Sequence, residues 1–108
     1  MSNDEDSIEE MPTTPRQLAQ EHPDVWEAYT ELGEATAEAG PLAGEQKRLV
    51  KLGIAIGTQS EGAVHSHVRR GLDEGVDPSA MRQVAILSIP TVGFPAAMAA
   101  LSWINDLV

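Results

Sequence analysis

Apolar residues recur along this chain with the period of a helix. Between residues 24 and 39 they fall every three to four positions, while glutamates line another face, and no stretch alternates like a strand. Prolines, glycines and capping residues divide the remainder. The sequence therefore predicts an all-α fold of about six helices, over residues 13–22, 24–39, 44–57, 60–74, 78–89 and from about 95 to the C-terminal end.

Three of these helices are apolar on nearly every side: the second half of 44–57, the helix from 78 to near Ile89-Pro90, and the last helix. Such helices must be enclosed by other protein. A folded unit of roughly 95 residues has too much surface for its volume to enclose all three. We therefore expect a homo-oligomer.

Residues 84–104 carry no charge and match a membrane span in length. Pro90, Gly93 and Pro95 lie in their middle and would free backbone groups that lipid cannot satisfy. The sequence predicts two buried helices here and no membrane association.

The chain is strongly acidic, with seven Lys and Arg against seventeen Asp and Glu and a formal net charge of −10. This charge opposes binding to nucleic acid or to an anionic membrane. Residues 1–12 predict a disordered acidic tail, and residues 13–108 predict a single helical domain. The tail lacks the features of a signal peptide, and the sequence therefore favours a cytoplasmic protein. Cysteine is absent, which excludes disulfides and thiol nucleophiles.

The candidate chemistry lies on the helix 60–74. At about 100° per residue, an inward stripe contains Val64, Val68, Gly71 and Leu72. Ser60 and His67 follow one margin of this stripe, and Glu61 and His65 follow the other. Because His65 and His67 lie about 200° apart around the helix, they cannot chelate one metal ion together.

Glu61 and His65 are four residues apart, which allows either an ordinary helix-surface pair or two ligands of an intersubunit metal site. His67 could serve as a general acid or base, or be a core histidine with its hydrogen bonds satisfied. Spacing alone leaves both pairs of alternatives open.

Three segments of the second half carry a family resemblance. They read LVKLGIAIG at 49–57, EGAVHSHVRRGLDEG at 61–75 and IPTVGFPAAMAAL at 89–101. The sequence resembles the carboxymuconolactone decarboxylase family, which includes the alkyl hydroperoxidase D-like proteins, and PDVWEAY at 23–29 also fits. The resemblance implies the all-helical alkyl hydroperoxidase D-like fold and assembly as a trimer or hexamer.

In the hydroperoxidase branch, this helix carries a Cys-x-x-Cys-x-x-x-His pattern. The resemblance places the histidine at His67, the two cysteines at Ser60 and Ala63, and the branch's relay glutamate at Arg48. With both sulfurs and the relay acid replaced, thiol-dependent peroxide reduction is excluded.

The decarboxylase branch works without a cofactor, and the resemblance implies acid–base chemistry on a small carboxylated or lactone-like molecule. We expect His67 to exchange the proton and Glu61 with His65 to position it. By position alone, Arg48, Lys51 and Ser60 are candidates for substrate binding. Arg48 could instead form an intersubunit salt bridge, and Lys51 could be a snorkelling side chain.

This interpretation predicts no cofactor and no metal ligand. Two alternatives stay open: a non-catalytic binding or assembly module on the same fold, and a metal-dependent site at Glu61 and His65.

The acidic composition also predicts adaptation to a salt-rich cytoplasm, because concentrated salt screens the repulsion among the carboxylates. The melting temperature is expected to rise from low to molar KCl. A flat or falling curve in a thermal denaturation series would contradict the hypothesis.

Overall fold

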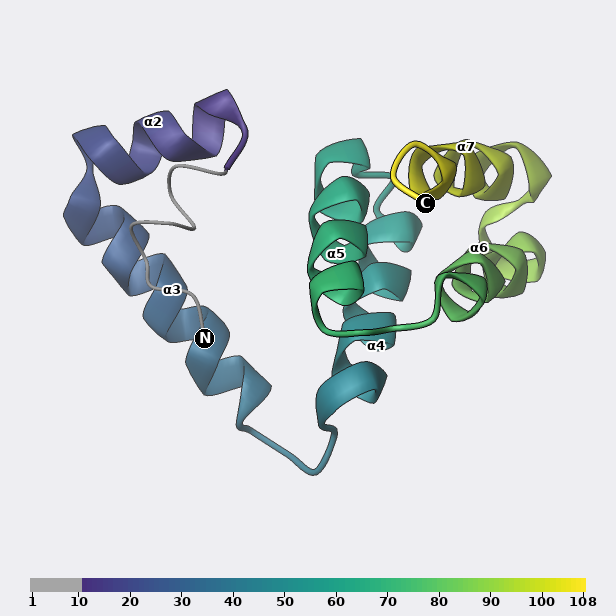
Figure 1. The fold of residues 1–108 in the computed structure, drawn as a ribbon, viewed down its shortest axis with the longest axis horizontal. Helices are drawn as coiled ribbons and strands as arrows, with labels where there is room; N and C mark the ends of the chain where they lie inside the picture. The colour runs from purple at the N-terminus through teal and green to yellow at the C-terminus, as the bar shows by residue number, and fades with distance from the viewer. Residues whose placement is uncertain (1–10) are drawn as a thin grey trace. The chain divides into compact units, whose positions relative to one another are not determined.

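The computed structural model describes residues 11–108, which contain six helices and no strand. The helices are α2 (Thr13–Glu21), α3 (Pro23–Ala37), α4 (Gly44–Gly57), α5 (Glu61–Asp73), α6 (Pro78–Val92) and α7 (Phe94–Asn105) (Figure 1). The all-α prediction is confirmed. Most of the predicted acidic tail lies outside the described residues, and Pro12, at its end, is the N-cap of α2.

The helices form two compact units that divide after Pro41. In the first unit α2 packs on α3, and His22 separates them as the C-cap of one and the N-cap of the other. The apolar stripe predicted on α3 exists, but Val25, Tyr29 and Leu32 are each more than half exposed. A two-helix unit offers too little surface to cover this stripe.

The second unit holds the core. Helix α4 packs against α5 and α6, and α7 packs against α6 and α5, so that each helix has two main neighbours (Figure 1). The largest fully buried side chains come from all four helices: Leu52, Ile56, Val64, Val68, Met81 and Ile104. Helix α5, which carries the candidate chemistry, is thus fixed on its inner face by α4 and α7.

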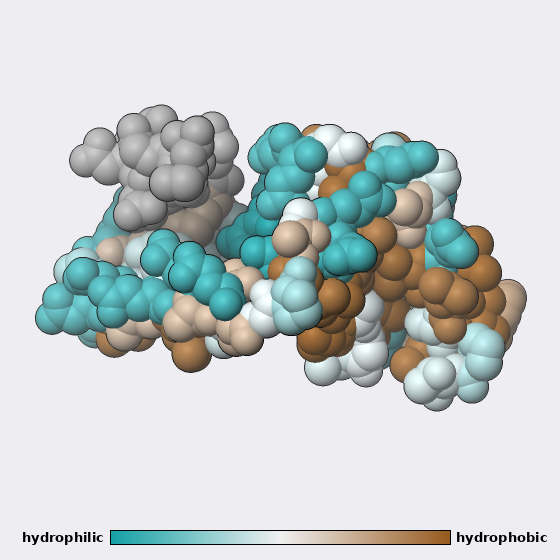
Figure 2. Space-filling model, turned by 90° about the horizontal axis from the view of Figure 1, so that it is seen from below, coloured by the Kyte–Doolittle hydropathy of each residue, from teal (hydrophilic) through white to brown (hydrophobic). Residues whose placement is uncertain are grey.

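Large apolar side chains also lie on the outside of this second unit. Ile54 on α4, Ile86 and Leu87 on α6, and Phe94 at the start of α7 are each more than half exposed. Figure 2 shows hydrophobic surface among the polar side chains of this part of the chain. These surfaces support the expectation that further protein encloses α4, α6 and α7, and the homo-oligomer stays a prediction.

Local signals set both ends of α5. Ser60 is its N-cap, and its Oγ accepts a hydrogen bond from the backbone N–H of Ala63 at 3.3 Å. At the other end Gly75 adopts φ +82°, and the backbone N–H of Val76 donates to the carbonyl of Gly71 at 2.8 Å. This Schellman-type turn ends the helix and fixes the position of Glu74.

Two details of the sequence interpretation are wrong. Helix α6 does not end at Ile89-Pro90 but continues to Val92, with Pro90 inside it. Because proline has no backbone N–H, the carbonyl of Ile86 lacks its helical hydrogen bond. Pro90 lies in the last turn and is exposed, so water can donate to this carbonyl instead. Leu72, assigned to the inward stripe, is 37% exposed, whereas the other three members, Val64, Val68 and Gly71, are buried.

None of the helices described between residues 11 and 108 is long and apolar enough to cross a membrane.

The buried Ile56 offers a direct test of this packing. Ile56→Ala is expected to lower the free energy of unfolding by about 2–5 kcal/mol, because it leaves a cavity in the core. Ile54→Ala, on the same helix but 62% exposed, is the matched control. Chemical denaturation at several protein concentrations should show a small effect for Ile54→Ala that grows only as subunits associate. Equal losses for both variants in dilute protein would contradict the core assignment.

Candidate functional site

The candidate site is organised around the guanidinium of Arg48, which α4 directs toward α5. Its Nε and one terminal nitrogen donate to the two carboxylate oxygens of Glu74, at 2.8 and 2.7 Å. Its other terminal nitrogen lies 2.8 Å from Nδ1 of His67. The Arg48 side chain is only 12% exposed. A charge with so little access to water needs a partner of opposite charge, and the carboxylate of Glu74 provides it.

A glycine, Gly71, lies where α5 packs against Met81 and the Arg48 side chain. A Cβ added at Gly71 would lie 3.4 Å from Cγ of Arg48 and 3.0 Å from Sδ of Met81. The contact with Sδ of Met81 is tighter than van der Waals packing usually allows, whereas the contact with Cγ of Arg48 is close to ordinary van der Waals distance. The small residue on the inner face of α5 therefore mainly makes room for the side chain of Met81 on α6.

The hydrogen bond from Arg48 sets the tautomer of His67. A guanidinium can only donate, so Nδ1 of His67 must accept, and the proton of the neutral ring is on Nε2. Burial, and after it the charges of Arg48, Arg70 and Lys51, lower the pKa of His67 to about 4, and Glu74 opposes this shift in part. At neutral pH the ring therefore presents an uncharged Nε2–H.

Positive charge gathers around this imidazole in an otherwise acidic protein. Of the seven Lys and Arg residues of the chain, Arg48, Lys51 and Arg70 act on His67. The pKa of Lys51 is itself lowered, first by burial and then by the neighbouring cations, while Arg48 holds the pKa of Glu74 low by hydrogen bonding. An anion beside His67 would be stabilised by this group of charges.

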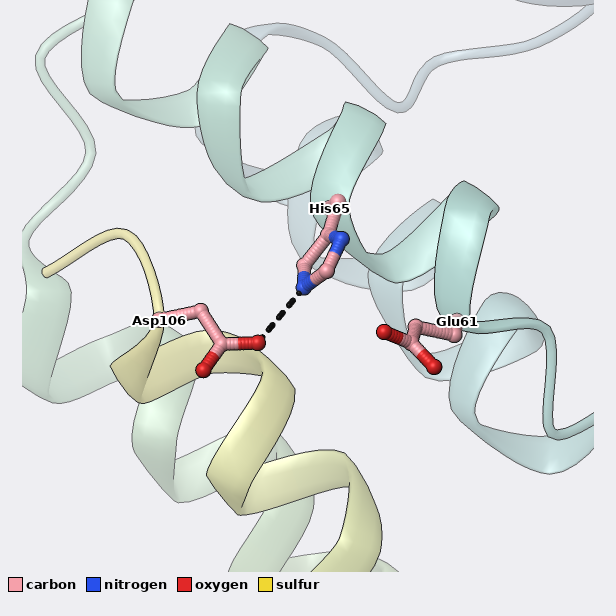
Figure 3. Close-up of side chains that lie close together, drawn as sticks. All are labelled: Glu61, His65 and Asp106. Atoms are coloured by element: carbon pink, nitrogen blue, oxygen red, sulfur yellow. Dashed lines mark hydrogen bonds and ion pairs between the residues drawn. The ribbon is translucent and has the colours of Figure 1, made fainter.

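A second polar group lies on the other margin of α5. Nε2 of His65 is 2.9 Å from Oδ2 of Asp106, which follows the last residue of α7. Glu61, one turn before His65, faces the same gap (Figure 3). One ligand atom from each of the three residues can be chosen so that all lie within 4.8 Å of one another. Glu61 and His65 thus form one group of ligand-bearing side chains with Asp106.

The predicted site residues consequently divide into separate groups. Within the described chain, the hydrogen bond and the charges that act on His67 come from Arg48, Lys51, Arg70 and Glu74, and not from Glu61 or His65. Ser60 is engaged as the cap of α5. The predicted separation of His65 and His67 on opposite margins matches their different partners, Asp106 and Arg48.

Sequence reasoning missed two members of these groups. Glu74 lies seven residues after His67, about 700° around a helix and so on nearly the same face, and this spacing could have identified it. Asp106 lies 41 residues after His65 and is brought to it only by the packing of α7 on α5. No local pattern marks that contact.

Comparison with known proteins agrees with this architecture. Residues 23–106 match the sequence profile of the carboxymuconolactone decarboxylase family. The chain belongs to this family. The match spans α3 to α7, so the resemblance inferred from the three sequence segments is confirmed. No curated protein matches the chain in sequence.

Within this carboxymuconolactone decarboxylase family protein, Arg48 is expected to hold the pKa of His67 down. Arg48→Gln should raise the pKa of His67 toward its ordinary value of 6.5, because a nearby positive charge is removed and Glu74 keeps its negative charge. Arg69→Gln removes an equal charge two residues from His67 and is the control, since Arg69 is not among the charges that act on His67.

The measurement is a proton NMR titration of the His67 ring. An unchanged pKa in Arg48→Gln, or an equal rise in both variants, would contradict the assignment. Because the folded pKa lies below the unfolded one, the unfolded chain binds the proton more tightly, and this group contributes stability that is present above pH 6.5 and lost as pH falls toward 4.

Proposed function

We propose that the protein carries out cofactor-free chemistry on a small carboxylated or lactone-like anion, with His67 as the group that contacts the reacting oxygen. Membership of the family supports a decarboxylase-like role in general. The observation that carries the specific proposal is the hydrogen bond from Arg48 to Nδ1 of His67, which leaves Nε2–H as the donor position of a neutral ring.

Loss of CO₂ from a carboxylated lactone illustrates what this donor could do. The bond between the carboxylate carbon and the ring breaks, and its electron pair delocalises into the lactone carbonyl as an enolate. A hydrogen bond from Nε2–H to the enolate oxygen would stabilise this charge. Water would then donate a proton to the carbon and leave as hydroxide. A neutral imidazole can act as this donor, because its Nε2–H can form a hydrogen bond to the oxygen while the ring itself stays uncharged.

The surrounding cations take two different roles in this proposal. Lys51 and Arg70 supply positive charge for the substrate carboxylate and the enolate. Arg48 is a positioning residue rather than the anion-binding residue expected from the sequence, because three of its donor positions are engaged by Glu74 and His67. Glu61 and His65 have no part in this reaction.

Carboxymuconolactone is the test substrate, and turnover is measured as CO₂ release. His67→Leu is expected to lower kcat by about 100-fold or more, since removing one donor to a developing oxyanion typically costs that much. His22→Leu, which removes an exposed histidine of the first unit, should keep full activity. Size-exclusion chromatography and circular dichroism confirm that both variants fold and assemble like the parent.

Equal turnover by His67→Leu and the parent protein would refute the role of His67. If the parent shows neither turnover nor thermal stabilisation with a panel of carboxylated lactones and dicarboxylates, the enzymatic proposal fails. That result would favour a non-catalytic binding or assembly module on the same fold.

A further inference from the structure

We propose that Glu61, His65 and Asp106 form a binding site for one divalent transition-metal ion of the Zn²⁺ type, linking α5 to the end of α7. The site is separate from the Arg48–His67–Glu74 group in position and in chemistry. It rests on the convergence of three ligand-bearing side chains from two helical regions that are distant in sequence.

The geometry needs little change to hold an ion. At bond lengths of about 2.0–2.1 Å, ligands in adjacent octahedral positions lie about 2.9 Å apart, and those in tetrahedral positions lie about 3.3 Å apart. Nε2 of His65 and Oδ2 of Asp106 are already 2.9 Å apart. All three ligand atoms lie within 4.8 Å of one another, and the exposed Glu61 side chain can rotate to shorten its separation from the other two.

Helix geometry directs Glu61 and His65 to the same place. Residues four apart project from one face of a helix, which is the spacing that many metal-binding helices use. Figure 3 shows Glu61 and His65 projecting from α5 into the gap that Asp106 enters from the end of α7. The third ligand therefore comes from the end of a different helix, so an ion bound here would be held by both α5 and the end of α7.

The donor set selects the class of ion. One imidazole nitrogen with two carboxylate oxygens suits Zn²⁺, Mn²⁺ or Fe²⁺, whereas Mg²⁺ prefers oxygen ligands alone and retains its waters. Two carboxylates compensate the charge of a divalent cation. Because Glu61 and Asp106 are exposed, water can complete the coordination.

Neighbouring interactions support this use of Asp106. The guanidinium of Arg82 donates to Oδ1 of Asn105 at 3.0 Å, so a basic side chain of α6 is engaged next to Asp106 rather than at its carboxylate. Among the described ion pairs, Asp106 takes part in one, with His65. A plain His65–Asp106 ion pair needs no contribution from Glu61, whereas a metal site requires all three residues.

Zinc binding by the full-length protein, purified without an affinity tag and freed of metal, tests the proposal. Isothermal titration with Zn²⁺ should give about one ion per chain. Glu61→Gln, His65→Gln and Asp106→Asn should each weaken binding tenfold or more, and the triple variant should abolish it. His22→Gln and Asp73→Asn are matched controls of the same residue types outside the site and should bind like the parent.

Zn²⁺ should also raise the melting temperature of the parent protein and not that of the triple variant, because the ion joins α5 to α7 in the folded state only. Excess Mg²⁺ should not displace Zn²⁺. Equal zinc binding by the parent and the triple variant would overturn the proposal, as would a loss of binding in Asp106→Asn with none in Glu61→Gln.

The His67→Leu variant separates this site from the proposed reaction. It should bind Zn²⁺ like the parent, and loss of zinc binding in His67→Leu would overturn the assignment to Glu61, His65 and Asp106. Because zinc binding is measured without substrate, failure of the metal site leaves the role of His67 to its own turnover test.

Discussion

A largely covered arginine that serves two acceptors organises the candidate site of this protein. The Arg48 side chain is 12% exposed, and a charge with so little access to water needs a partner of opposite charge. Glu74 neutralises it by accepting two hydrogen bonds, and His67 accepts a third. Together these bonds tie α4 to α5 and determine which nitrogen of His67 carries the proton.

This arrangement changes what the family fold can do. By resemblance, the thiol-dependent branch has a glutamate where this chain has Arg48, and cysteines where it has Ser60 and Ala63. A cation in place of the acid makes the surroundings of the histidine positive, which disfavours a protonated ring and favours an anionic ligand. The other margin of α5 carries carboxylates and His65, a chemistry suited to cations. One helix thus presents two opposite electrostatic environments.

Much of this architecture could be predicted from the sequence. Helical periodicity and capping residues located the six helices, and the angular spacing of His65 and His67 placed them on opposite margins of α5. Tertiary contacts could not be predicted in the same way: Asp106 reaches His65 only because α7 packs on α5, and Arg48 turned out to be paired with Glu74. The exposed stripe on α3 shows the same limit, because periodicity reveals an apolar face but not what covers it.

The tautomer of His67 tests the central claim most directly. In protein labelled with ¹⁵N on the imidazole rings, two-bond correlations to the ring protons report at neutral pH which nitrogen of His67 is protonated. The Arg48 hydrogen bond predicts a neutral ring with the proton on Nε2 and an unprotonated Nδ1. A proton on Nδ1, or a doubly protonated ring at neutral pH, would contradict both the hydrogen bond and the proposed use of Nε2–H.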